Sequence, residues 1–146
     1  MYQMTITLFT ICNTGILFFW VLLLFFPKKK FTQAVMAYPW VPAVLALFYG
    51  YFLFSSGGLA EADFTSLEGV TQLFKNATPA SVAAGWIHYL AFDFWVGCTL
   101  LVWSQKQGIP HLVVVFPLIC TFMLGPLGVL LFVIFTRAYR ALKPKA

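Results

Sequence analysis

Long uncharged segments constrain the fold of this chain more than any other feature. Four predominantly apolar stretches are each long enough to cross a bilayer as a helix, which needs about 20 residues. The sequence therefore predicts an all-α membrane protein, a single membrane domain over residues 1–146 with four transmembrane helices. We place these spans at residues 4–26, 35–54, 80–103 and 111–135.

Composition supports the membrane class and leaves no room for a soluble domain. Hydrophobic residues make up 62% of the chain and charged residues 9%, whereas soluble domains are about 45–50% apolar. The span at 4–26 lacks a basic start and an Ala-x-Ala cleavage pattern, so we expect it to stay attached. An Arg- and Ser-rich transit segment is also missing, so we expect a bacterial inner membrane, with a processed organelle form as the alternative.

Most of the positive charge lies in two clusters that adjoin span ends. These are "PKKK" at 27–30 and the tail "RAYRALKPKA" at 137–146, within a net charge of +5. Their position favours anionic lipid headgroups as partners over nucleic acid. The Lys and Arg count that normally sets orientation does not decide it here. Four spans would place Lys28, Lys29, Lys30 and Lys106 on one side and Lys75, Arg137, Arg140, Lys143 and Lys145 on the other.

The only sizeable polar stretch separates the second and third spans. Within it, Phe64, Leu67, Val70 and Phe74 recur at helical spacing. The pattern predicts a short amphipathic helix that lies on the membrane surface or against the mouth of the bundle. A plain loop with incidental periodicity is the alternative.

Glycine and proline residues predict a turn between the last two spans and a bend within the fourth. Gly108 and Pro110 predict a tight turn, which makes the third and fourth helices antiparallel neighbours. Within the fourth span, Gly125, Pro126 and Gly128 predict close helix approach and a kink.

The segment "AGWIHYLAFDFWVG", residues 84–97, places a carboxylate inside an apolar span. An ionisable side chain at bilayer depth costs at least about 2.5–3.5 kcal/mol, so Asp93 needs a partner, a cavity or a proton. Helix geometry puts the Cβ atoms of His88 and Asp93 roughly 10 Å apart, too far for a direct hydrogen bond. We therefore predict that these two side chains face opposite ends of one bound molecule, with Tyr89 between them.

Other spans supply polar atoms at matching depths. Counting from the span ends predicts one layer of Asn13 with His88 and another of Asp93 with Thr121. Together with Trp86 and Tyr89, these side chains could line a slot for a flat, long apolar ligand. The alternative is that Asn13 and Thr121 bond neighbouring helices, a common task of polar residues in membranes.

Cofactor and metal chemistry find little support in the sequence, and we expect no cofactor. His88 and His111, the only histidines, would lie roughly 20 Å apart in depth, too far for a bis-histidine haem. One histidine and one aspartate do not make a metal site. Cys12, Cys98 and Cys120 fall in three different spans without Cys-x-x-Cys spacing, which indicates packing residues.

Several motifs in this chain carry a resemblance to a known family. The run "FTSLEGVTQLF", then "AGWIHYLAFDFWVG", "GIPHL", "PLICTFMLGPLG" and a terminal arginine resemble the abscisic-acid-deficient-four-like family of small four-span membrane proteins. The resemblance covers the C-terminal half most closely. In the N-terminal half, Asn13, Trp20 and Pro27 follow the pattern.

The resemblance implies carotenoid chemistry. Plant members are needed to convert violaxanthin to neoxanthin, a redox-neutral rearrangement in which an epoxide opens and an allene forms. The histidine and aspartate of the family motif correspond to His88 and Asp93, and its threonine, glycine and proline correspond to Thr121, Gly125 and Pro126. The resemblance identifies these positions as part of the family motif and does not assign a catalytic role to any of them.

These observations support one leading hypothesis and two alternatives. The leading hypothesis is a cofactor-independent isomerase that binds a carotenoid or another isoprenoid between helices, with Asp93 and His88 as acid and base. The first alternative is a non-enzymatic protein that holds a carotenoid, quinone or lipid. The second is a small proton-coupled transporter, which the lack of visible inverted repeats disfavours.

Overall fold

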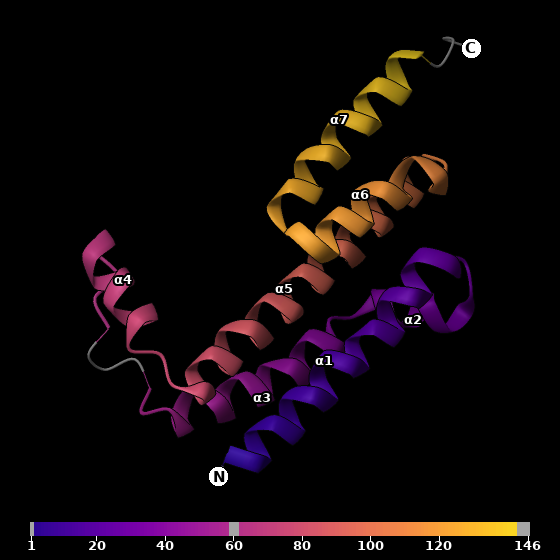
Figure 1. The fold of residues 1–146 in the computed structure, drawn as a ribbon. Helices are drawn as coiled ribbons and strands as arrows, with labels where there is room; N and C mark the ends of the chain where they lie inside the picture. Colours follow the sequence, from indigo (N-terminus) through magenta and orange to yellow (C-terminus); the bar gives the residue numbers. More distant parts are fainter. Residues whose placement is uncertain (1, 59–61, 143–146) are drawn as a thin grey trace.

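The chain folds into helices that lie along one central helix. The computed structural model describes residues 2–58 and 62–142, and within these ranges every regular element is a helix (Figure 1). The helices are α1 (Tyr2–Phe25), α2 (Lys30–Ala37), α3 (Trp40–Ser55), α4 (Leu67–Lys75), α5 (Pro79–Lys106), α6 (His111–Leu124) and α7 (Pro126–Leu142).

Helices α1 and α5 are long and apolar enough to cross a membrane. With 24 and 28 residues they extend about 36 and 42 Å, beyond the roughly 30 Å of a hydrocarbon core. A capping box fixes the start of α5, since Thr78 and Ser81 each accept a hydrogen bond from the other's backbone N–H. Gly108, at a φ of 64°, forms the turn into α6.

The second predicted span is a bent pair of helices. Helices α2 and α3 meet at an angle of 55°, and together they are apolar enough to form one crossing. The break lies at Tyr38 and Pro39. Proline has no N–H to donate and clashes with the preceding turn, so a helix cannot run straight through this position. Among the described helices, two or three therefore qualify as membrane spans.

The prediction of one continuous fourth span at 111–135 was wrong. The chain breaks at Gly125, which has a φ of 52° that a side chain would disfavour, and Pro126 then begins α7. Helices α6 and α7 fold back on each other, with Gly128 directly against the backbone and side chain of Thr121. The sequence indicated a kink here, whereas the structure shows a full reversal (Figure 1).

The open end of this α6–α7 hairpin, where α6 begins and α7 ends, lies near the C-terminal end of α5. Arg140 of α7 lies 5.0 Å above the ring of Trp103 and donates a 2.8 Å hydrogen bond to Gln107. At the other end of the hairpin, Gly125 lies beside Asp93, midway along α5. With 14 residues, α6 extends only about 21 Å, so the hairpin covers half the length of α5.

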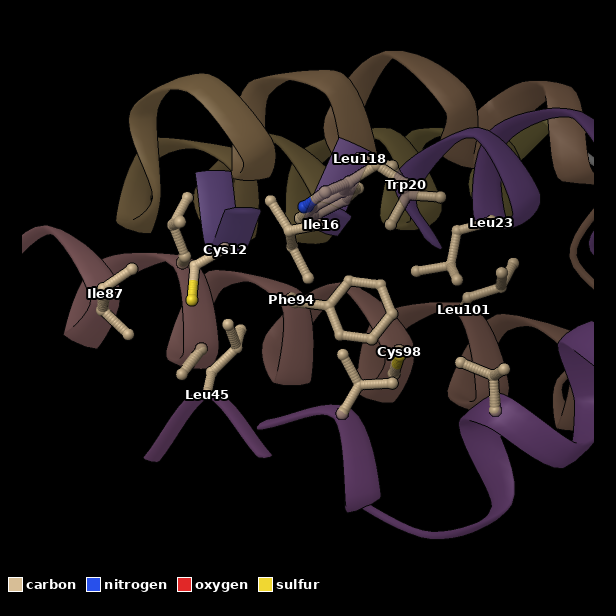
Figure 2. Close-up of a cluster of buried hydrophobic side chains, with 14 of the residues drawn as sticks. Cys12, Ile16, Trp20, Leu23, Leu45, Ile87, Phe94, Cys98, Leu101 and Leu118 are labelled. Atoms are coloured by element: carbon tan, nitrogen blue, oxygen red, sulfur yellow. The ribbon is translucent and has the colours of Figure 1, made fainter. Parts of the chain in front are cut away.

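Large apolar side chains from α1, α3, α5 and α6 form the core (Figure 2). Phe94 of α5 lies at its centre and packs edge-on against Trp20 of α1 at 5.7 Å. Gly97 provides the space for this indole, because a Cβ there would lie 2.7 Å from the Trp20 ring. Many other large apolar side chains remain exposed, which suits a surface that faces lipid.

The structure confirms the amphipathic helix predicted between the second and third spans. Ser66 caps α4 by accepting a hydrogen bond from the N–H of Gly69. None of its residues is buried, and Leu67 and Phe74 are 84% and 73% exposed. An apolar face left open in this way fits a helix that lies on the membrane surface.

Candidate functional site

Asp93 packs against the turn of the α6–α7 hairpin. A Cβ built on Gly125 would lie 3.0 Å from Asp93 Oδ1, closer than an ordinary van der Waals contact, so the glycine lets the turn approach the carboxyl group without displacing it. The side chain is half-buried and lies midway along α5. No lysine or arginine lies within any of the apolar stretches, which leaves this carboxyl group without a cationic partner at its depth.

One helix break lies beside this carboxyl group, and a second is linked to the neighbouring residue Phe94 by ring contacts. The first is Gly125 itself. The other is the α2–α3 break, because Trp40 at the start of α3 contacts Phe19 at 5.5 Å and Phe19 contacts Phe94 at 6.0 Å. Non-helical backbone is tolerated at membrane depth only where it is buried in protein or lines a polar cavity. The turn at Gly125 therefore brings irregular backbone next to the intramembrane acid, midway along α5.

His88 faces a different neighbour. Its ring lies 5.6 Å from Tyr49 of α3 and 4.7 Å from Phe92 on its own helix. Five residues of helix turn it about 140° from Asp93, which faces the hairpin instead. The structure therefore does not bring the two predicted catalytic side chains to one face of α5, and their joint role remains a prediction.

Asn13 is paired with Trp86. The indole Nε1 of Trp86 donates a 2.8 Å hydrogen bond to Asn13 Oδ1 and links α5 to α1. The sequence predicted a layer of Asn13 with His88, and the structure places Trp86, two residues earlier, beside Asn13. Trp86 is 49% exposed, so its ring still has a free face. This bond fits the alternative in which Asn13 ties helices together.

Thr121 also serves the packing of helices. It has no exposed surface, and its hydroxyl donates a 2.9 Å hydrogen bond to the carbonyl of Pro117, four residues earlier on α6. Gly128 of α7 lies directly against it. The predicted layer of Asp93 with Thr121 is therefore displaced by one helical turn, with Gly125 in contact with the acid.

An apolar groove of about 360 Å³ lies between the starts of α1 and α5. It is lined by Tyr2, Thr5, Ile6, Phe9, Ala77, Pro79, Val82 and Ala83. Sequence reasoning did not identify this groove, because it forms between two segments that are far apart in the sequence.

One face of α5 leads from this groove to the acid. Val82, Trp86, Tyr89 and Asp93 follow one another at spacings of four, three and four, which places them on a single side of the helix. Val82, Trp86 and Tyr89 are all at least 49% exposed. We call these four residues the Asp93 face. The 4–3–4 spacing could have shown from the sequence that Trp86 and Tyr89 share a helix face with Asp93, whereas His88 does not.

A second polar atom near this region was also missed. Nε1 of Trp20 is buried and has no hydrogen-bond partner among the residues that the structure describes. Its ring packs on Gly97, one turn after Asp93 on α5. The sequence gives no signal for such an unpaired donor, since it depends on how the indole is oriented in the core.

Comparison with known proteins supports the resemblance noted in the sequence. A family model described as ABA DEFICIENT 4-like matches residues 7–132, which include most of α1, all of α2 to α6 and every predicted site residue. No curated protein and no solved structure matches the chain. Because the family model covers most of its length, the chain belongs to the ABA DEFICIENT 4-like family.

Proposed function

We propose that this protein binds a carotenoid or another long isoprenoid along the Asp93 face and isomerises it by proton transfer. The family association with neoxanthin formation supports the substrate class. The observation that carries the proposal is the contact between Asp93 and Gly125, at the inner end of an exposed aromatic path. An acid at this depth is costly to retain without a function.

The proposed reaction needs no oxidant or reductant. The protonated carboxyl group of Asp93 donates its proton to the epoxide oxygen, and the C–O bond breaks as that oxygen becomes a hydroxyl. A neighbouring C–H bond supplies the electron pair for the new double bond, and its proton passes to the carboxylate. Asp93 is thereby restored, and one carboxyl group serves as acid and then as base. His88 has no step in this scheme, because it faces α3.

Pigment analysis in a host that makes violaxanthin tests this proposal. We expect the wild-type chain to yield the allenic product and Asp93→Asn to lower the yield about 100-fold or more, the usual contribution of a general acid or base. Glu68→Gln, which removes an exposed carboxylate on α4, is the matched control and should leave the yield unchanged. An unchanged pigment profile for wild type would exclude this substrate, and full activity of Asp93→Asn would exclude the catalytic role.

A second candidate function is a binding or assembly protein without catalysis. It is favoured by the roles of Asn13 and Thr121. Asn13 bonds Trp86 on another helix, and Thr121 bonds the carbonyl of Pro117 on its own helix and packs against Gly128, so both side chains serve helix structure and Asp93 is the one acid on its face. A purified protein that carries a chemically unaltered pigment in its absorption spectrum, with no product formed, would support this function over the isomerase.

The family association also bears on location. The apolar helices indicate a membrane protein. The family is named for abscisic acid deficiency, which is a plant trait. A plant-related family does not fit the bacterial inner membrane that the sequence led us to expect.

A further inference from the structure

The reversal at Gly125 changes where the positive charges lie. A continuous fourth span would carry Arg137 and Arg140 to the side opposite Lys28 and Lys106. The hairpin instead returns α7 to the C-terminal end of α5, as the contacts of Arg140 with Trp103 and Gln107 show. Lys143 and Lys145, the remaining cations of the tail, lie outside the described residues.

The end of α1 meets the same end of α5. Gln105 donates a 3.3 Å hydrogen bond to the carbonyl of Pro27, and Gln33 donates a 3.0 Å bond to Gln105. His111 at the start of α6 bonds the carbonyl of Leu24. These contacts place the following cations at one end of the bundle, a group that we call the basic collar: Lys28, Lys29, Lys30, Lys106, Arg137 and Arg140.

Few charges lie at the opposite end, where α4 precedes α5. Those in the described residues are Asp63, Glu68 and Lys75. Hydrogen bonds from Ser66 and Thr65 lower the pKa of Asp63 to about 2, so this carboxyl group is ionised at neutral pH. The formal charge is thus six positive at the basic collar and one net negative at the α4 end, by count of these side chains.

We propose that the basic collar lies among anionic phospholipid headgroups on the cytoplasmic side of the membrane, with α4 and the start of α1 on the other side. Segments rich in Lys and Arg remain on the side from which a membrane protein is inserted. That leaflet also carries the anionic lipids that attract juxtamembrane cations. The three described acids lie at the α4 end or midway along α5, so lipid phosphates are the counter-ions within reach.

This orientation has a consequence for the Asp93 face. The hairpin occupies the half of the membrane nearest the basic collar, and the groove between the starts of α1 and α5 lies in the other half. If the proposed function holds, its ligand enters from the leaflet opposite the basic collar. The orientation itself does not depend on any ligand.

Labelling of single added cysteines in a bacterial host tests the orientation. The native thiols are buried, so wild type supplies the background. We expect a membrane-impermeant maleimide to label Asn76→Cys in intact spheroplasts, and to label Lys29→Cys and Ala141→Cys only after lysis. Four spans would make Ala141→Cys behave like Asn76→Cys, and that outcome would overturn the proposal.

Lipid-dependent stability tests the partner. We expect phosphatidylglycerol to raise the Tm of the purified protein more than phosphatidylcholine does, because it supplies anionic headgroups. Replacing Lys28, Lys29 and Lys30 with Gln should reduce that difference at least by half, whereas Lys75→Gln at the opposite end should leave it intact. Equal shifts with both lipids, or an undiminished difference in the triple variant, would overturn the proposal.

Discussion

Helix α5 is contacted in different ways by α1 and by the α6–α7 hairpin. Along α1, contact is made by large rings, as Trp20 packs on Gly97 and against Phe94. At the hairpin, contact is made by backbone, as Gly125 meets the carboxyl group of Asp93. The hairpin is itself held together by Gly128 against Thr121.

The difference shows which contact can adapt to change. A ring or a carboxyl group can shift to admit a new atom, whereas the backbones of α6 and α7, which meet at Thr121 and Gly128, cannot separate without moving whole helices. The hairpin that Asp93 faces is therefore built with less tolerance than the contacts that α5 makes with its neighbours. Substitutions at glycine should reveal this contrast.

Gly128→Ala should have the largest effect. Its Cβ would overlap the backbone of Thr121, and overpacking against backbone should lower the free energy of unfolding by about 3 kcal/mol or more. Gly85→Ala is the control, since nothing lies within 4 Å of its Cβ position, and it should change stability by about 1 kcal/mol or less. Chemical unfolding in detergent measures both, and equal effects would remove the contrast.

Gly125→Ala should have an intermediate effect. Its backbone has a positive φ and its Cβ would press on Asp93, so we expect a loss of about 2 kcal/mol. Gly108 also has a positive φ, but its Cβ position is in open space. Gly108→Ala therefore measures the cost of the backbone strain alone, which should be smaller than the loss for Gly125→Ala. Combining Asp93→Ala with Gly125→Ala should restore the part of the lost stability that comes from the clash between the new Cβ and the carboxyl group. Full additivity of these two changes would show that the turn and the acid are not in contact.

Removing the hydrogen bond between Trp86 and Asn13 should have the smallest effect on stability. Interhelical hydrogen bonds in membranes average about 0.6 kcal/mol, so Asn13→Ala and Trp86→Phe should show a coupling energy near that size. Trp95 is an equally exposed tryptophan on α5, and Trp95→Phe combined with Asn13→Ala should be additive. If the coupling energy between Asn13 and Trp86 were as large as that between Gly125 and Asp93, the contact with α1 would not be the weaker of the two.

Several of the helices were predictable because apolar length and helical periodicity are local properties. Apolar runs identified α1 and α5, and the 3-3-4 spacing from Phe64 to Phe74 identified α4. The reversal at Gly125 was not predictable in the same way. "LGPLG" is compatible with a kink or a turn, and the choice depends on whether α7 can pack on α6 through Thr121 and Gly128.

The candidate site was predicted in its residues more than in its geometry. Asp93 stood out because a carboxyl group in an apolar span is costly. Depth along a helix correctly placed Asn13 near the level of Trp86 and His88, but rotation about the helix decides which neighbour each side chain meets. Depth grouped Asn13 with His88 and Asp93 with Thr121, whereas the structure places Trp86 beside Asn13 and Gly125 beside Asp93.

The most direct test of the hairpin is the distance between its two open ends. Nitroxide labels on Lys106→Cys and Ala141→Cys, in a chain whose native cysteines are replaced by alanine, report it by pulsed electron spin resonance in liposomes. The hairpin predicts a short distance, because Arg140 and Gln107, one residue inward on each side, are hydrogen-bonded. A continuous helix over residues 111–141 would separate the labels by roughly 45 Å, and that result would contradict the account of Asp93 and its turn.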